Sequence, residues 1–307
     1  MAQPIQKALF LRTHMKKEKV AIIGLGNVGA TIGHLLSLAG YEIVAVCSRS
    51  QQNKDKHRQF VSGPFFTSVA EASHLAEVVI ITTQDANIAR VCLEIAQAKS
   101  FQKNAKVIHM SGAGGVDMLE QVHEQGAYRA CIHPIHSFAN IQNSIAFLAG
   151  TVFGITCDDK IKDWCINFVH DLKGVPVMIA NEDKAIYHVA SCMASSYFTT
   201  LIYMVEEMYK SIGMTPEEAR KAFLPLVKGT LKNIEDNGAV VALSGPIARG
   251  DVNTILQHLT SIKKHIPDLY DVYVEMGLNA IRVANEQGHL SREKIQAMQK
   301  IFSGGSK

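Results

Sequence analysis

A glycine-rich turn that directly follows a short apolar segment constrains this chain more than any other feature of its sequence. Residues 19–23 (KVAII) predict a strand, residues 28–39 predict a helix that stops at Gly40, and residues 42–47 (EIVAVC) predict a second strand. The turn between the first strand and the helix reads G-x-G-x-x-G and consists of Gly24, Leu25, Gly26, Asn27, Val28 and Gly29. In this strand–turn–helix context, the pattern is typical of a dinucleotide-binding site.

The three glycines of the turn meet separate steric needs. Gly24 permits the tight turn, Gly26 lets the backbone approach a pyrophosphate, and Gly29 lets the helix pack closely on the strand. The first N–H groups of the helix have no partner within the helix, and they favour phosphate oxygens. The sequence therefore predicts that the turn binds the diphosphate of a dinucleotide.

The end of the second predicted strand indicates which dinucleotide is bound. NAD sites usually have Asp or Glu there, to accept a hydrogen bond from the ribose 2′-hydroxyl. This chain has Ser48, Arg49 and Ser50, and no acidic residue before Asp55. Arg49 can stack on adenine and pair with a 2′-phosphate, to which both serines can donate. We predict NADP rather than NAD; the alternative is a solvated basic loop.

The rest of the first half alternates strands and helices. Further strands are predicted at residues 77–82, 105–110, 128–133, 151–156 and 175–179, with a helix at residues 160–172. Their nearly continuous Val/Ile runs indicate strands covered on both faces, in a mostly parallel sheet. Ligands of such sheets bind at the carboxyl edge. We therefore expect the cofactor site to continue through Thr82, Thr83, Asp85, Ser111 and Gly112.

After about residue 180 only helical periods and helix caps remain, with N-caps expected at Thr215, Asp251 and Ser291, so we expect two domains. The predicted fold is α/β, with a doubly wound, mostly parallel Rossmann sheet followed by an all-helical C-terminal domain. The expected parts are a flexible arm (1–18), an NADP-binding domain (19–180) and a helical substrate and dimerisation domain (181–307). The apolar helix at residues 197–208 favours a homodimer.

Composition excludes several other classes of protein. The 31 basic and 28 acidic residues nearly balance, which gives no support to nucleic-acid binding. No apolar run of about 18 residues is present, so we predict no membrane span. The six cysteines are scattered without a CxxC pair, which favours reduced thiols in a cytoplasmic protein and predicts no metal site.

Four further motifs, together with the glycine turn, resemble a known family. They are residues 133–138 (HPIHSF), 184–188 (KAIYH), 225–234 (PLVKGTLKNI) and 243–251 (LSGPIARGD). The set resembles bacterial Rossmann-like oxidoreductases whose helical C-terminal domain, of unknown function, carries an LTGPIARGD-like loop. The wider relatives are pyrroline-carboxylate reductases, β-hydroxyacid dehydrogenases and ketopantoate reductases. This chain departs from the family pattern at Ser196, where asparagine is usual, and at Ser244, where threonine is usual.

The resemblance and general chemistry together suggest catalytic groups. Hydride transfer to a carbonyl builds negative charge on oxygen, which needs a proton donor. Related dehydrogenases use a lysine on the first long helix after the Rossmann domain, so Lys184 is our first candidate. His188 lies one helical turn later and could relay the proton, and His133 could orient the substrate. The alternatives are a surface lysine, a buried histidine and a turn residue, respectively.

Three residues of the second half are candidate substrate ligands. Asn233 could bond a substrate hydroxyl or carbonyl, and Ser244 retains a hydroxyl in the Gly-Pro loop. Arg249 could clamp a carboxylate through two parallel hydrogen bonds, or could instead form a structural ion pair with Asp251.

We therefore expect an NADP-dependent reductase of a small 2-oxo acid. Ketopantoate is the best single substrate, because some similar proteins are linked to ketopantoate reduction in pantothenate synthesis. The alternatives are an imine reductase of the pyrroline-carboxylate type, a non-catalytic NADP-binding sensor, and a deazaflavin-linked NADP reductase.

Overall fold

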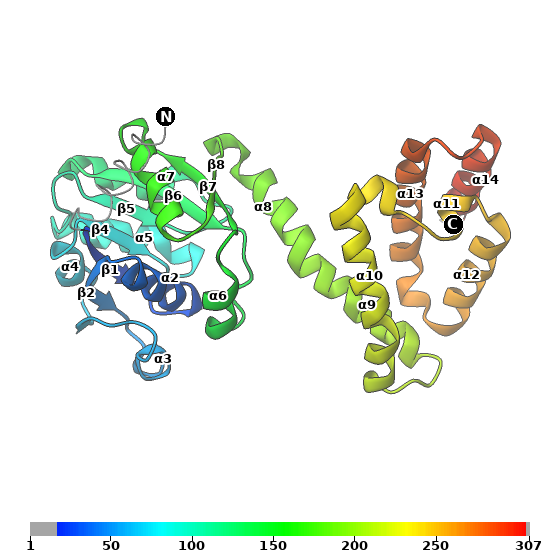
Figure 1. The fold of residues 1–307 in the computed structure, drawn as a ribbon, viewed down its shortest axis with the longest axis horizontal. Coiled ribbons are helices and arrows are strands. Elements are labelled where there is room, and N and C mark those ends of the chain that lie inside the picture. The colour runs from blue at the N-terminus through cyan, green and yellow to red at the C-terminus, as the bar shows by residue number, and fades with distance from the viewer. Residues whose placement is uncertain (1–16, 305–307) are drawn as a thin grey trace, which may run out of the picture. The chain divides into compact units, whose positions relative to one another are not determined.

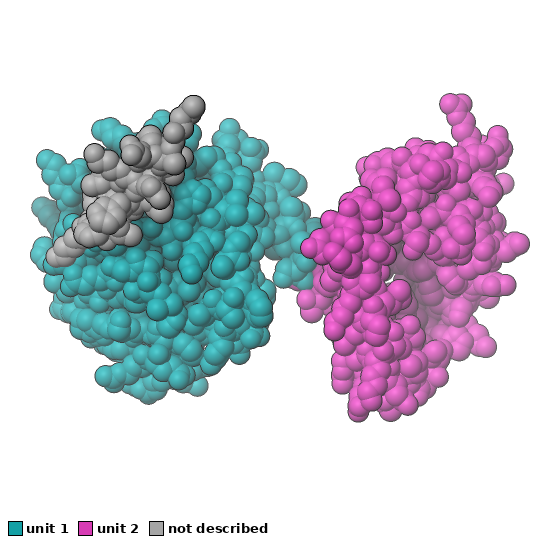
Figure 2. Space-filling view, in the orientation of Figure 1, with its two compact units in different colours: residues 1–195 teal, residues 196–307 magenta. Residues whose placement is uncertain are grey.

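The computed structural model describes residues 17–304, which form two compact units that meet in sequence at Ser195 and Ser196 (Figure 2). The boundary expected from the sequence lies fifteen residues earlier, but residues 181–195 group with the first unit because their side chains contact its sheet. Most of the expected N-terminal arm lies outside the described residues. Its last two residues are held in place: Lys17 pairs with Asp171, and Glu18 pairs with Lys106.

The first unit is built on an eight-stranded sheet of order β3-β2-β1-β4-β5-β6-β7-β8. The strands are β1 (Lys19–Ile23), β2 (Glu42–Cys47), β3 (Phe65–Phe66), β4 (Val78–Ile81), β5 (Lys106–His109), β6 (Tyr128–Pro134), β7 (Val152–Cys157) and β8 (Val175–Met178). Every neighbouring pair is parallel except β6 and β7. The predicted doubly wound, mostly parallel sheet is confirmed. The sequence did not reveal β3, because two residues carry no periodic pattern.

Helices cover both faces of this sheet (Figure 1). One face packs against α2 (Asn27–Leu38), α6 (Ile141–Phe147) and α7 (Lys162–Asp171). The other packs against α4 (Val69–His74), α5 (Asp85–Gln97) and the 3₁₀ helix η1 (Val116–Gln125). The expectation of two covered faces does not hold for β8, the last strand of the sheet, whose Val175, Val177 and Met178 are exposed.

Chain connectivity reverses between β1 and β4. The first crossover helix, α2, and the later one, α5, lie on opposite faces of the sheet, and such a reversal opens a crevice at the carboxyl ends of the strands. Because β2, β1, β4, β5 and β6 are neighbours and parallel, their carboxyl ends share one edge. The short helices α3 (Gln51–His57), η2 (Asp159–Ile161) and η3 (Asn181–Asp183), and the longer α8 (Lys184–Cys192), complete the unit.

The second unit is helical throughout its described part, 196–304. After the π-helical turn η4 (Met193–Tyr197) come α9 (Phe198–Lys210), α10 (Pro216–Ala242), α11 (Pro246–Arg249), α12 (Val252–His265), η5 (Pro267–Leu269), α13 (Tyr270–Gln287) and α14 (Arg292–Ser303). Thr215, Asp251 and Ser291 cap α10, α12 and α14 as expected from the sequence. Helices α12, α13 and α14 share an apolar core. Among residues 17–304, no helix is long and apolar enough to cross a membrane.

Candidate functional site

The glycine turn joins β1 to α2 in a shape that only glycine permits at two positions. Gly24 has a φ of +106°, and its N–H donates to the carbonyl of Cys47 at 2.9 Å. A Cβ on Gly29 would lie 2.2 Å from the carbonyl oxygen of Gly24. The Thr82 hydroxyl donates to this same oxygen at 2.7 Å and so braces the turn from β4. The turn is therefore held from β2 and from β4.

The opening of α2 fits a phosphate group. Gly26 is the N-cap, no side chain caps the helix, and its first turn carries no acidic residue. A Cβ on Gly26 would meet nothing within 4 Å, so the space beside its backbone is open. Nearby, the Thr83 hydroxyl oxygen at the end of β4 is buried without a partner among the described residues. Free N–H groups at a helix start bind anions, so these features fit a dinucleotide diphosphate.

The predicted 2′-phosphate residues follow β2, beside the glycine turn. The Ser48 side chain is buried and donates to the carbonyl of Ser50 at 3.3 Å. Ser50 caps α3 by accepting from the Asn53 N–H, and Arg49 is exposed. The three residues thus lie at the same sheet edge as the turn, one strand away.

On the other side of the turn, the loop after β5 is fixed by a buried histidine. His109 Nε2 lies 2.9 Å from the carbonyl of Gly115, and its Nδ1 accepts from the Ser111 N–H at 3.2 Å. Both nitrogens of the neutral ring thus form hydrogen bonds. Burial lowers the pKa of His109 to about 4. The Ser111 hydroxyl donates to Asp85 at 2.7 Å. Two predicted cofactor residues, Asp85 and Ser111, are therefore in contact.

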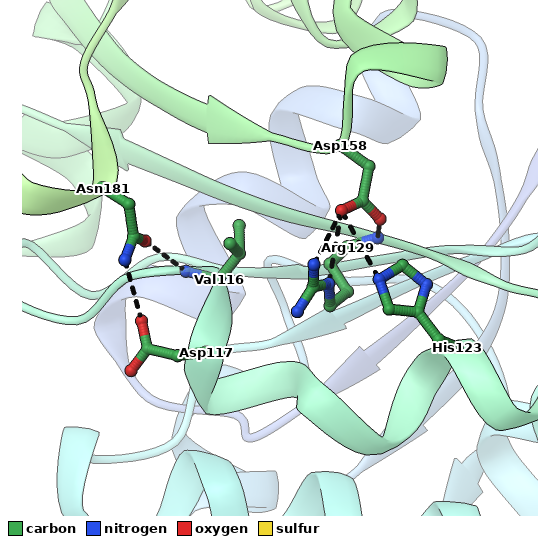
Figure 3. A network of polar contacts seen from close by, with 6 residues as sticks. All are labelled: Val116, Asp117, His123, Arg129, Asp158 and Asn181. Atoms are coloured by element: carbon green, nitrogen blue, oxygen red, sulfur yellow. Dashed lines mark hydrogen bonds and ion pairs between the residues drawn. The ribbon is translucent and has the colours of Figure 1, made fainter.

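Asn181, just before α8, forms further hydrogen bonds to the segment that follows this loop (Figure 3). Its side-chain oxygen accepts from the Val116 N–H at 3.0 Å, and its amide nitrogen donates to Asp117 at 3.3 Å. The other network of Figure 3 joins Asp158 to Arg129 and His123 at the amino end of β6, which is the opposite edge of the sheet. That network supports the fold rather than the site.

Lys184 is the charged group at the centre of the site edge. Its side chain is only 2% exposed, and its Nζ donates to the carbonyl of Ser111 at 3.2 Å and to the sulfur of Cys131 at 3.1 Å. It also lies 5.2 Å from the ring centre of Tyr187. Burial raises the pKa of Cys131, so this sulfur is a neutral thiol. The predicted surface-lysine alternative does not describe this environment.

Two imidazoles and a phenol lie close together near Lys184. His133 Nδ1 lies 3.0 Å from the Tyr187 hydroxyl, and the His133 and His188 rings are 6.0 Å apart. A Cβ on Gly112 would come within 3 Å of both imidazoles. Burial first, and then the nearby Lys184 and His188, lower the pKa of His133 to about 4, which leaves it neutral at pH 7. The structure therefore brings together all three predicted catalytic residues.

Sequence reasoning assigned no role to His109, Cys131, Asn181 or Tyr187. Two of them carried a signal in their spacing. Cys131 is two residues from His133 on one strand and so shares its face, and Tyr187 is three residues from Lys184 on one helix. His109 and Asn181 carried none, because their partners are backbone groups of a loop.

The three predicted substrate ligands belong to the second unit. Asn233 is exposed on α10, Ser244 is exposed just before α11, and Arg249 ends α11 with an exposed side chain. Their roles remain predictions. Among residues 17–304, no group of three or more His, Cys, Asp or Glu side chains could hold a metal ion.

Solved structures with the same fold include several oxidoreductases. A Bacteroides fragilis protein assigned as an NADP oxidoreductase is 19% identical over 86% of this chain and 98% of its own, with a TM-score of 0.71. Plasmodium falciparum pyrroline carboxylate reductase with NADP bound is 16% identical over 92% and 99%, at 0.59. An imine reductase from a Pseudomonas species is 18% identical over 94% and 95%, at 0.56.

Two domain families match the sequence itself, while no curated protein matches the chain. Residues 1–134 match the Rossmann-like domain, and residues 151–279 match a domain of unknown function, DUF2520. The resemblance inferred from the glycine turn and the 243–251 loop is thereby confirmed. The chain thus combines a Rossmann-like domain with a DUF2520 domain.

Proposed function

We propose that this protein is an NADP(H)-dependent oxidoreductase that reduces a C=O or C=N bond of a small molecule. One observation carries the proposal. A single sheet edge holds both the open start of α2, which suits a diphosphate, and the Lys184 cluster, which can supply positive charge and protons. Both features lie within the first unit.

The cofactor residues are those expected from the sequence. The N–H groups of the turn bind the diphosphate, and Arg49 with Ser48 and Ser50 binds the 2′-phosphate. The NADP bound to the Plasmodium reductase supports this choice of dinucleotide. Asp85, Thr82, Thr83, Ser111 and Gly112 follow along the edge toward Lys184, in the order of β4 and β5, and face the reactive end.

When bound, NADPH supplies a hydride. Lys184 stabilises the negative charge that then develops on the acceptor atom, since its positive charge is held in a dry environment where such charge acts strongly. Because Lys184 is almost fully buried, the partly exposed His188 passes the proton to the substrate. His133 is neutral and offers a hydrogen bond that orients the substrate. Asn233, Ser244 and Arg249 are further proposed as substrate ligands.

Ketopantoate remains the first substrate to test, because Arg249 is suited to a carboxylate. A cyclic imine is the second candidate. It is favoured by the shared fold of the Plasmodium pyrroline carboxylate reductase and the Pseudomonas imine reductase.

The test follows NADPH oxidation at 340 nm with ketopantoate, with pyrroline-5-carboxylate and with a deazaflavin, alongside NADPH binding. Turnover of one substrate identifies the reaction. Binding with no turnover of any of the three favours a cofactor sensor.

Arg49→Gln should weaken NADPH binding about tenfold or more and leave NADH binding unchanged, because only NADPH carries the 2′-phosphate. Equal effects on both dinucleotides would contradict the assignment of Arg49.

We further propose that the protein is a homodimer through its helical unit. Helix α9 buries none of its side chains, and several large apolar residues of α9 and α10 are exposed. Patches of this kind mark interfaces.

The six unpaired cysteines suit the reducing cytoplasm, where we place the protein.

A further inference from the structure

A second buried histidine, His57, touches the glycine turn from the side of β2. It is the last residue of α3 and is 3% exposed. Its Nδ1 lies 2.8 Å from the carbonyl oxygen of Leu25, the second residue of the turn. A carbonyl only accepts hydrogen bonds, so Nδ1 carries the proton and donates.

The other nitrogen of this ring has no partner. His57 Nε2 is buried, and no described residue forms a hydrogen bond with it. A buried polar atom without a partner destabilises the folded state, and a leucine at this position would avoid that cost. Packing alone therefore does not explain a histidine here. The distinctive contribution of the residue is the bond to Leu25.

Helix α3 connects the two parts of the proposed cofactor site. It starts at Ser50, whose hydroxyl caps it, and it ends at His57 on the turn. Ser50 is also the last residue of the triplet proposed to bind the 2′-phosphate. Seven helical residues span about 10 Å and form a rigid connection. The hydrogen bond of His57 thus couples the position of the triplet to the diphosphate turn.

We propose that His57 is a positioning residue for cofactor selectivity. Through α3 it holds Ser48, Arg49 and Ser50 at a fixed place relative to the turn, so that one dinucleotide engages both at once. The inference rests on the proposed NADP function, and His57 acts on the cofactor only through Leu25 and α3.

The chain provides a matched control in His34 of α2. His34 Nδ1 lies 2.9 Å from the carbonyl of Phe60, so it joins α2 to the segment that follows α3. It makes the same kind of histidine-to-backbone bond as His57 does. It does not bond to a residue of the glycine turn.

The experiment measures the Kd of NADPH and of NADH by calorimetry, with the full chain and its variants His57→Leu and His34→Leu. His57→Leu should lower the NADH-to-NADPH Kd ratio about tenfold, mainly through weaker NADPH binding, which corresponds to the loss of one charge-assisted contact. His34→Leu should leave the ratio unchanged. A second pair guards against misfolding. His57→Asn places an amide donor near the Nδ1 position and should keep the ratio, whereas His57→Gln places it near Nε2 and should lower it.

The outcomes separate the two proposals. If the unaltered protein binds no NADPH, the proposed function fails. If it prefers NADPH and the ratio for His57→Leu stays within about twofold of it, or if His34→Leu lowers the ratio equally, the role of His57 is overturned. If Asn and Gln at position 57 behave alike, the bond to Leu25 is not the cause, and the inference is equally overturned.

Discussion

Among single residues, Lys184 is unusual because its charged side chain is almost fully buried. A lysine is almost never fully buried unless it is paired. Among residues 17–304 no carboxylate forms an ion pair with it, and its hydrogen-bond partners are a carbonyl and a thiol, both neutral. Burial first, and then the neighbouring positive charge of Lys184, lower the pKa of both His133 and His109. Functional sites concentrate perturbations of this kind.

Lys184→Met should abolish most of the turnover and raise the pKa of His133. Methionine keeps the length of the side chain but removes the charge, so the loss should be about a hundredfold to a thousandfold, as for removal of a group that stabilises charge in the transition state. Loss of a neighbouring positive charge favours protonated His133, whose pKa should rise from about 4. NADPH oxidation and histidine NMR titration measure the two effects. The exposed Lys162→Met serves as the control. Unchanged turnover would exclude Lys184 as proton donor or charge stabiliser.

The lowered pKa of His109 predicts that the folded state loses stability in mild acid. Its pKa of about 4 in the folded chain lies below the ordinary value of 6.5, because burial disfavours the charged ring. Protonation of Nδ1 would also remove the acceptor of the Ser111 N–H. Between pH 6.5 and 4 the unfolded chain binds this proton and the folded chain does not. Stability is therefore complete above pH 6.5 and falls as the pH drops, by about 2 kcal/mol at pH 5.

Urea denaturation followed by the fluorescence of Trp164, which is in the first unit, measures this dependence. His109→Gln has no titrating ring and should flatten the curve by the same amount. His133 shares the direction of the shift, so some pH dependence remains in the variant. Identical slopes for the two proteins would refute the role of His109.

Among the elements, the turn between β1 and α2 contains both glycines that the fold requires and a glycine that the proposed cofactor site requires. Two of its glycines are required by contacts inside the protein, while Gly26 faces open space. The sequence predicted this turn and its flanking elements to within a residue, because strand period, glycine positions and helix start are all local.

Strand β8 was recognised as a strand but placed wrongly between two covered faces, because the position of a strand in the sheet is not local information.

Gly26→Ala should keep the fold and weaken the binding of NADPH. Its Cβ would meet no protein atom within 4 Å, but would project where the backbone approaches the phosphates, so the Kd should rise about tenfold or more. Gly29→Ala is the matched variant. Its Cβ would lie 2.6 Å from the Thr82 hydroxyl and closer still to the Gly24 carbonyl, so the fold itself should lose about 1–3 kcal/mol. Thermal unfolding and calorimetry distinguish the two. Normal NADPH binding by a folded Gly26→Ala protein would contradict the placement of the diphosphate.

At the scale of the whole molecule, the two units differ in how completely they bury their apolar residues. The first has a core on each face of its sheet. The second has one small core in α12–α14 and leaves apolar residues of α9 and α10 exposed, among them Leu201, Tyr203, Leu224, Leu226, Leu231, Ile234 and Val241. This asymmetry is the basis of the proposed dimer.

Sedimentation equilibrium should give twice the chain mass of 33.6 kDa for the unaltered protein. Leu226→Glu puts a charge into the exposed apolar surface of α10 and should shift the mass toward that of one chain, because burying an unpaired charge opposes association. Lys228→Glu, on the same helix, is the control for added negative charge. A monomer for the unaltered protein at micromolar concentration would refute the dimer.

The sequence by itself determined the class of fold, the glycine turn, the residues after β2 and the caps of the late helices. Each depends on residues within one or two helical turns or one strand, so local periodicity and backbone preference are sufficient. Only the tertiary structure decided what surrounds Lys184, since Ser111 and Cys131 are 73 and 53 residues away. The contacts of His109 and His57 with loop carbonyls were equally invisible, because a backbone acceptor leaves no mark in the sequence. Long-range packing brings Lys184, His133 and His188 together as a candidate reaction centre.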